Sequence, residues 1–241
     1  MKIHRFIIQN NLKTDNLEIV DQEIVGQIKN VLRLKVGEEV IVGDGKGKEI
    51  LAEIKEIGKS SIVLKINQVK ENNNEPKNSV TLYCAVLKKE NFELVTQKAT
   101  EVGIKNIIPV ISERTIKLGL NKERLEKIAK EAAEQSGRGV VPVISEPMSF
   151  EKAVESASRE GSSFLFDSSG EVFKENSLNG EVSAFIGPEG GWTERELSLA
   201  RSNGLSIVSL GKLTLRAETA AIIASYLLIK QWKISEAKQR V

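Results

Sequence analysis

The stretch FIGPEGGWTERE, residues 185–196, places three glycines and a proline between an apolar strand and the start of a helix. Thr193 and Glu196 have the T-x-x-E spacing of a capping box, which predicts that a helix begins at Thr193. Glycines allow a ligand to approach the main chain and permit positive φ, and Pro188 stiffens the loop. Because a tight strand-to-helix connection would usually need a single glycine, we expect this loop to contact a ligand.

A second loop of the same kind follows in SLGKLTLRAETA, residues 209–220. Here a strand ends at Gly211 and an apolar helix begins near Glu218. In open α/β sheets, ligands bind at the carboxyl ends of the strands. We therefore predict that the two loops follow adjacent strands and bound one crevice with their main-chain groups. Neither loop has the spacing of a phosphate-binding motif, and GDGKG at Gly43 is predicted to be a hairpin tip, with positive φ at Asp44 and Gly45.

The pattern around these loops predicts an α/β fold in two domains. From residue 76 onward, apolar strands alternate with helices, as in a parallel sheet covered on both faces. Before residue 72, short strands with one helix over about Asp21–Arg33 indicate a small barrel. The polar, Asn-rich segment around Pro76 separates the two, so the predicted domains are 1–72 and 76–241.

Helices are expected in the second domain at five places. Asn91 is predicted to cap the first, which ends at Gly103, and the others cover Lys122–Ser136, Phe150–Arg159, Thr193–Ser202 and Glu218–Trp232. The last is apolar nearly all round, so it is buried on more than one side. It is therefore either a central core helix or a helix that also packs on a second subunit.

Composition excludes several classes of function. The 241 residues are 40% hydrophobic and 28% charged with net charge +2, and they contain no apolar run typical of a membrane span or signal peptide. Cys84 is the sole cysteine, which fits a reducing cytoplasm, and its apolar surroundings predict a buried structural thiol. With His4 as the sole histidine, neither a Ser-His or Cys-His pair in the interior motifs nor a zinc or other metal site is expected.

A third candidate segment is EAAEQSGRGVVP, residues 131–142, in which Gln135, Ser136 and Arg138 crowd the end of a helix. Gly137 can be an ordinary helix C-cap, with Arg138 a solvated charge near the helix carboxyl end. The alternative, equally open, is that Arg138 belongs to a functional site.

Seven segments occur in the order HRFII, NVLRLKVGEEV, KATEVGI, ISERT, EQSGR, IGPEGGWTERE and LGKLTLRAETA. Together they resemble the bacterial 16S ribosomal RNA uridine-N3 methyltransferases of the SPOUT superfamily, and the resemblance spans nearly the whole chain. GPEGGW followed by LRAETA is its most specific part. Leu213 and Thr214 depart from the family pattern, which more often has a basic and an aliphatic residue there.

The resemblance implies a PUA-like RNA-binding β-barrel followed by a SPOUT methyltransferase domain with a parallel sheet and a C-terminal trefoil knot. It implies a cytoplasmic homodimer that methylates N3 of a specific uridine in 16S ribosomal RNA of the small ribosomal subunit, with S-adenosylmethionine as cofactor and no membrane or metal partner. In relatives the knot loops hold the cofactor. Carried over to this sequence, the cofactor-binding residues are Phe166, Gly187, Pro188, Glu189, Gly190, Gly191, Leu210, Gly211, Leu215, Arg216, Ala217 and Thr219.

The chemistry of uracil suggests roles for three charged residues. N3 is a poor nucleophile until it loses its proton, and the resulting anion spreads its charge to O2 and O4. A guanidinium stabilises such an anion well. We expect Arg138 to reach the uracil, from the partner subunit in a dimer, and Arg216 to order the loop or the target. Glu189 is a candidate proton acceptor, and bulk base and an RNA phosphate are the alternatives.

Five basic residues are candidates for contacts with RNA phosphates: His4, Arg5, Arg33 and Lys35 in the barrel, and Arg114 in the α/β domain. Taken singly, each of them is more readily explained as an ordinary surface charge. Two other functions remain open at this point, namely a SPOUT methyltransferase that acts on transfer RNA ribose or another base, and an RNA-binding assembly factor without methyl transfer.

Overall fold

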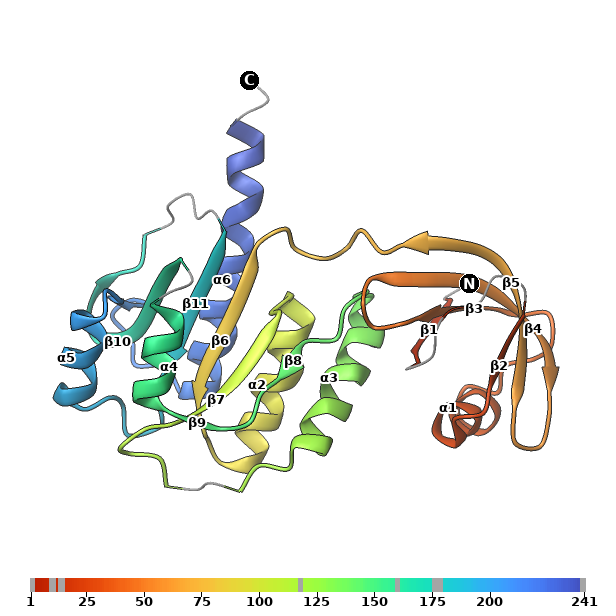
Figure 1. Ribbon diagram of the computed structural model, residues 1–241, viewed down its shortest axis with the longest axis horizontal. Helices are drawn as coiled ribbons and strands as arrows, with labels where there is room; N and C mark the ends of the chain where they lie inside the picture. The colour runs from red at the N-terminus through yellow and green to blue at the C-terminus, as the bar shows by residue number, and fades with distance from the viewer. Residues whose placement is uncertain are drawn as a thin grey trace. The chain divides into compact units, whose positions relative to one another are not determined.

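The computed structural model describes residues 3–8, 12, 16–116, 119–158, 161–174 and 180–238, with the backbone alone from 231 onward (Figure 1). The chain forms two compact units. The first comprises Met1–Glu75 and Ala133–Val141, and the second comprises Pro76–Ala132 and Pro142–Val241. Within the described ranges, no helix is long and apolar enough to cross a membrane.

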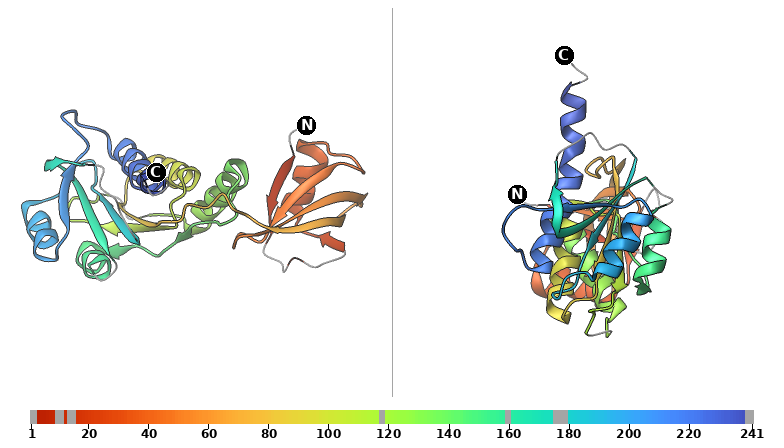
Figure 2. Two further views of the ribbon diagram at one scale, coloured as in Figure 1. Left: turned by 90° about the horizontal axis from the view of Figure 1, so that it is seen from above. Right: turned by 90° about the vertical axis from the view of Figure 1, so that its left-hand side faces the viewer.

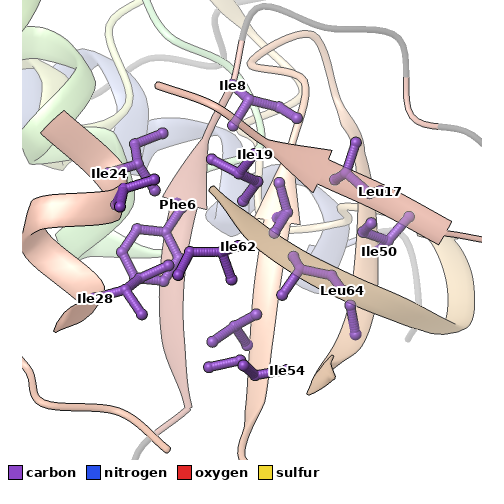
Figure 3. Close-up of a cluster of buried hydrophobic side chains, with 14 residues drawn as sticks. Phe6, Ile8, Leu17, Ile19, Ile24, Ile28, Ile50, Ile54, Ile62 and Leu64 are labelled. Atoms are coloured by element: carbon purple, nitrogen blue, oxygen red, sulfur yellow. The ribbon is translucent and has the colours of Figure 1, made fainter. Parts of the chain in front are cut away.

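A five-stranded sheet forms the first unit, in the order β1-β3-β4-β5-β2. β1 pairs parallel with β3, and the other pairs are antiparallel. Alternate side chains of these strands point to one side, where they form an apolar core with the short helix (Figure 3). The strands are β1 His4–Ile7, β2 Asn16–Ile19, β3 Glu39–Gly43, β4 Lys48–Ile57 and β5 Ile62–Glu71.

The predicted hairpin tip joins β3 to β4, but its backbone differs from the expectation. Positive φ occurs at Gly45 (69°) and Gly47 (110°), whereas Asp44 does not have it. Asp44 instead uses its side chain, whose Oδ1 accepts hydrogen bonds from the backbone N–H of Lys46 at 2.7 Å and Lys48 at 3.1 Å. A carboxylate that closes the turn through its own acceptor removes the need for a left-handed aspartate.

The helix predicted over Asp21–Arg33 is present, in two parts. Asp21 caps α1 (Gln22–Gly26) by accepting from the N–H of Glu23 at 2.9 Å. A π-helical turn, Gln27–Val31, follows directly. Arg33 then has a φ of 54°, a left-handed conformation that is uncommon for a residue with a side chain. The chain therefore leaves this helix through a turn wider than sequence periodicity anticipates.

The second unit contains a seven-stranded, wholly parallel sheet with the order β12-β10-β11-β6-β7-β8, and β9 also pairs with β7. This confirms the predicted α/β class, a small N-terminal β-sheet with a parallel C-terminal sheet. The strands are β6 Ser79–Ala85, β7 Asn106–Ile111, β8 Val143–Ile144, β9 Met148–Ser149, β10 Ser162–Val172, β11 Glu181–Ile186 and β12 Ser206–Ser209.

Helices cover both faces of this sheet (Figure 2). One face carries α4 and α5, whose apolar residues share a core with β6 and β11, and the other face carries α2 and α6. Cys84 of β6 is fully buried, as predicted. The helices are α2 Lys89–Val102, α3 Lys122–Ser136, α4 Phe150–Ala157, α5 Glu194–Ser202 and α6 Ala217–Lys238; residue 159, where the predicted α4 ended, lies outside the described ranges.

α2 ends at Gly103 as predicted, with a φ of 109°, but it does not begin at Asn91. Its N-cap is Lys88, which makes no side-chain cap hydrogen bond, and Asn91 lies in the first turn. The helix therefore starts one turn earlier than the capping preference of Asn indicated, because burial of Phe92 and Val95 fixes its position against the sheet.

Among the described residues of the first unit, Glu49 is the most deeply buried carboxylate, with 2% of its surface exposed. It pairs with Arg5 and with Lys70 at 3.1 Å, and Asn72 Nδ2 donates to it at 2.9 Å. Burial opposes its ionised form, but the hydrogen bonds from Asn72 and Arg5 outweigh burial and lower the pKa of Glu49 below 4.5. Its contribution to stability is thus present above the unfolded pKa and is lost as pH falls through the folded value.

We expect Glu49→Gln to lower the free energy of unfolding by about 2 kcal/mol at neutral pH, because one charged acceptor is lost from a buried cluster. The difference from the wild type should shrink in urea titrations at progressively lower pH. Glu53→Gln, which breaks an exposed pair with Lys55 (2.8 Å), is the control and should change stability little. A pH-independent effect of Glu49→Gln would contradict the role assigned to its charge.

Candidate functional site

The two glycine-containing loops follow β11 and β12, but these strands are not adjacent, contrary to the prediction. β10 lies between them in the sheet. Because all three strands are parallel, their carboxyl ends still share one edge. The part of β10 that pairs with both neighbours ends at Phe166, and this end of β10 forms the middle of the site, with one glycine-containing loop on either side.

A cavity of about 710 Å³ lies at this edge, and eleven of the twelve predicted cofactor residues line it. Thr219, exposed in the first turn of α6, is the exception. The prediction did not include several other lining residues, of which the polar ones are Lys88, Asn91, Asp167, Ser168, Ser209, Thr214 and Glu218. Lys88 is the N-cap of α2 and Asn91 lies in its first turn, directly after β6, so a fourth strand end contributes to the same cavity.

An irregularity in β10 brings Asp167 and Ser168 into the cavity wall. Phe166 and Glu171 both pair with Val208 of β12, so the four residues between them bulge out of the strand. Asp167 Oδ1 stabilises the bulge by accepting from the N–H and hydroxyl of Ser169, at 2.9 and 2.7 Å. Gly170 is required there, because a Cβ would lie 2.6 Å from the backbone nitrogen of Val208.

The glycine loop after β11, residues 187–192, is a tight turn. The N–H of Gly191 donates to the carbonyl of Pro188 at 2.8 Å, and Gly191 has a φ of 70°. Residues other than glycine rarely adopt this backbone, which is why the sequence needs glycine at this position. The capping box predicted just beyond the loop is confirmed, with Thr193 and Glu196 each accepting from the other's N–H.

Trp192 fixes the loop to the core. Its ring packs against Phe150 with 4.9 Å between ring centroids, and Phe150 in turn contacts Phe185. Its indole Nε1–H donates to the carbonyl of Phe166 at 3.3 Å, which joins the loop to the end of β10. Gly187 lies beneath the indole, where an added Cβ would be 3.1 Å from the ring. Gly187 is thus needed for packing, whereas Gly191 is needed for its φ.

Two of the three predicted catalytic residues, Glu189 and Arg216, line the cavity, and both are exposed. Glu189 Oε1 accepts from the N–H of Lys88 at 3.4 Å. Burial raises the pKa of the Cys84 thiol, and the negative charge of Glu189 adds to this effect. The Glu189 carboxylate therefore lies near the end of β6.

Arg138 is not among the residues that line this cavity. It belongs to the first unit, where it is 5% exposed and its guanidinium pairs with Glu75, with Nη2–Oε2 at 2.8 Å. The same carboxylate accepts from the N–H of Gly139 at 3.0 Å and Val140 at 3.1 Å. Arg138 is therefore not the solvated charge of the simpler alternative. Gly137 does have the left-handed φ of a helix C-cap, 80°.

Four of the five candidate RNA contacts lie in the first unit. Arg5 pairs with Glu49, His4 is partly buried in the same strand, and Arg33 and Lys35 are exposed after the π-helical turn. Arg114 lies in the second unit, after β7, where its Nη1 donates to the carbonyls of Gly190 and Trp192. A resemblance at the level of motifs gave no sign of this contact.

The cavity suits a cofactor of the size of S-adenosylmethionine. Its volume falls in the range of about 300–1,000 Å³ that small-molecule sites occupy. Its wall combines glycine main chain, the apolar side chains of Phe166, Leu210 and Leu215, and charged groups at Glu189 and Arg216. Such a wall can contact an aromatic base through apolar groups and its polar edge through main-chain donors and acceptors.

Comparison with known proteins agrees with this geometry. Residues 73–229 match the model of the RNA methyltransferase domain, and residues 28–67 match that of the RNA methyltransferase PUA domain. Ribosomal RNA small subunit methyltransferase E of Rickettsia conorii is 33% identical, with 93% of this chain and 94% of that protein covered. The same-named protein of Bacillus subtilis is 30% identical, with 84% and 85% covered.

Solved structures give the same result. The crystal structure of ribosomal RNA small subunit methyltransferase E from Neisseria gonorrhoeae, bound to S-adenosylmethionine, is similar with a TM-score of 0.89 and 30% identity, covering 96% of this chain and 98% of that one. A Legionella pneumophila structure with bound cofactor has a TM-score of 0.87 and 29% identity, covering 95% and 97%. The chain therefore belongs to the RNA methyltransferase family of ribosomal RNA small subunit methyltransferase E, which confirms the resemblance found in the sequence.

We expect Gly191→Ala to weaken binding of S-adenosylmethionine several-fold, because a side chain at a φ of 70° costs about 1–2 kcal/mol and shifts the loop. Gly204→Ala is the matched control, since Gly204 has a similar φ of 82° in open space and lies outside the cavity wall. Both variants should lose similar stability in thermal unfolding, while calorimetric titration should show weaker binding for Gly191→Ala alone. Equal binding by the two variants would contradict the loop assignment.

Proposed function

We propose that this protein transfers a methyl group from S-adenosylmethionine to N3 of a specific uridine in 16S ribosomal RNA of the small ribosomal subunit. The observation that carries the proposal is the cavity in which both glycine-containing loops and the end of β10 meet. Its support from relatives is the similar Neisseria gonorrhoeae structure, which is bound to the same cofactor.

The cofactor supplies a methyl group activated by a positively charged sulfur. The cofactor-binding residues of this chain are the main chain of Gly187–Gly191 and Leu210–Ala217, with Phe166 and Leu215 as apolar contacts. Thr219 keeps its assignment from the family resemblance alone. Main-chain groups suit this task because they are already fixed by the sheet and the turn before the ligand arrives.

Methyl transfer to N3 forms one N–C bond, breaks one S–C bond and requires N3 to lose its proton. We assign Glu189 as the proton acceptor, with bulk base as the alternative, because its carboxylate lies on the cavity wall. Arg216, on the opposite loop, stabilises the negative charge that appears on the uracil oxygens or orders the target. Arg138 is assigned to the uracil from the partner subunit, with Glu75 holding the guanidinium in a fixed orientation.

The finer fold is also a proposal: a closed PUA-like barrel in the first unit and a trefoil knot in the second. For the barrel, the support is the match of residues 28–67 and the apolar core to which all five strands and the short helix contribute side chains. For the knot, it is the return of the chain from β12, beyond β10, through the loop at Leu210–Arg216 to α6, which packs on β11 and β6.

A homodimer is supported by the apolar surface of α6 and its neighbour α2. Ile223 and Tyr226 of α6 are 36% and 53% exposed, and Leu94 of α2 is 39% exposed, although the two helices pack together. A second copy of the chain is the occupant that would cover this surface and allow Arg138 to reach the partner's site.

We therefore expect a mass of twice 26.6 kDa by light scattering. Tyr226→Glu should shift the protein toward the monomer, because a charge would be buried without a partner. Arg201→Glu, a charge change at an exposed position of α5, away from the α2–α6 surface, is a control for net charge. A monomeric wild type would refute the dimer.

The cytoplasm, where ribosomal RNA is assembled into subunits, is the proposed location.

RNA binding is assigned to His4, Arg5, Arg33 and Lys35, where phosphate contacts should make affinity depend strongly on salt. Arg5 can contact RNA only through the guanidinium N–H donors that do not bind Glu49.

The experiment that tests the function is methylation of small ribosomal subunits from a strain lacking the enzyme, followed by nucleoside digestion and mass spectrometry. The expected product is 3-methyluridine, formed only with protein and S-adenosylmethionine together. A methylated ribose or another methylated base would show instead a methyltransferase with a different target. Binding of RNA without cofactor binding would show an assembly factor.

Within this assay, Arg138→Ala should slow methylation by at least tenfold while cofactor affinity stays close to that of the wild type, because Arg138 lies outside the cavity wall. Its thermal unfolding is measured in parallel, since Glu75 would lose its partner. Wild-type turnover by a folded Arg138→Ala protein would remove the catalytic assignment.

A further inference from the structure

Arg114 contacts the glycine loop directly. It lies in the turn after β7, in the sequence ISERT, and its Nη1 donates to the carbonyl of Gly190 at 2.6 Å and to that of Trp192 at 3.3 Å. Its stem packs on the same loop, because a Cβ added to Gly190 would lie 3.3 Å from Arg114 Cδ. One side chain therefore bonds two carbonyls and covers the glycine between Glu189 and Gly191.

The peptide group between Gly190 and Gly191 is fixed at both of its polar atoms. Its carbonyl accepts from Arg114, and its N–H donates to the carbonyl of Pro188 at 2.8 Å. Rotation of this peptide would break both hydrogen bonds. Two consecutive glycines carry the largest backbone entropy that a loop can have, so a contact that fixes their peptide plane removes a cost that ligand binding would otherwise include.

The turn that carries Arg114 is itself well ordered. Ser112 and Thr115 close it, with the N–H of Ser112 donating to Thr115 Oγ1 at 3.0 Å and the N–H of Thr115 donating to the Ser112 carbonyl at 3.1 Å. Arg114 is thus presented from a fixed backbone rather than from a long flexible segment.

A buried carboxylate joins the same two segments a second time. Glu196 is 3% exposed; its Oε2 accepts from the N–H of Thr193 at 2.8 Å, and its Oε1 accepts from the N–H of Glu113 at 3.0 Å. The capping box of α5 therefore also binds the turn after β7. Arg114 and Glu196 therefore stabilise the glycine loop in complementary ways. Arg114 donates to its carbonyls, and Glu196 accepts from the N–H of Thr193, which follows the loop.

We propose that Arg114 is a positioning residue for the cofactor loop, and that its contribution to the reaction comes through the orientation of the Gly190–Gly191 peptide rather than through an RNA phosphate. This inference rests on the proposed function of the cavity. It reassigns a residue that the sequence placed among the RNA contacts, and it gives ISERT a role in cofactor binding.

The two roles of Arg114 predict opposite results. As a positioning residue, Arg114→Ala should raise the calorimetric Kd for S-adenosylmethionine about tenfold, the usual effect of losing hydrogen bonds from a charged donor. Its RNA affinity, and the slope of log Kd against log salt, should equal those of the wild type. As a phosphate contact, the same change should lower that slope by roughly 0.8 and leave cofactor affinity intact.

Arg201→Ala is the matched control, since it removes an exposed arginine of α5 that does not line the cavity. If Arg114→Ala fails to fold, Arg114→Lys is measured instead, because it keeps the charge and the stem but is one atom shorter. A cofactor Kd raised at least threefold in Arg114→Lys supports the proposal, and a wild-type Kd overturns it. Failure of the wild-type protein to bind S-adenosylmethionine would instead refute the proposed function, so the two failures are distinguishable.

Discussion

The site depends on one constraint: a loop of glycines cannot fix its own shape. Glycine loses more backbone entropy on folding than any other residue and has no side chain whose contacts could offset that loss. In this protein the loop between β11 and α5 is therefore fixed by groups around it. Trp192 inserts into the aromatic core, Glu196 closes the helix start, and Arg114 binds the carbonyls from outside. Because these side chains outside the loop stabilise its conformation, the main chain of the loop itself stays exposed to the cavity.

The parallel sheet makes this arrangement possible by placing several strand ends at one edge. β6, β10, β11 and β12 all end at the cavity, although they are distant in sequence. The bulge in β10 extends the edge locally, since it moves Asp167 and Ser168 out of register and toward the cavity. The hydrogen bond from Trp192 to the Phe166 carbonyl then joins the glycine loop after β11 to β10, the middle strand of the site.

Sequence reasoning located the fold class and the two main loops, because both depend on local signals. The capping box at Thr193 and the C-cap at Gly103 are encoded within a few residues, and the structure confirms both. Motif resemblance supplied the family. The strand order could not be predicted from such signals. The sequence predicts that β11 and β12, which precede the two glycine-containing loops, are neighbours, whereas packing across the whole sheet places β10 between them.

Long-range partners were missed for the same reason. Arg114 resembles any exposed cation in sequence, and its two acceptors are main-chain carbonyls that no pattern reveals. Asn91 has a strong capping preference, but burial of the α2 face sets the start of that helix. Arg138 was recognised as a candidate from its motif, while its pairing with Glu75 joins residues 63 positions apart.

The pairing of Arg138 has a chemical consequence. A guanidinium and the carboxylate that it binds form an ion pair with little net charge, so the field of the pair falls off faster with distance than that of an isolated cation. In the proposed mechanism, Arg138 would therefore act on the uracil mainly through directed hydrogen bonds, for which a fixed orientation is an advantage. Arg216 lies on the cavity wall and is exposed, so water screens its charge until a bound ligand excludes the solvent. The two arginines are therefore not equivalent in the proposed mechanism: Arg138 would act through its fixed orientation, and Arg216 would act through its positive charge beside the base.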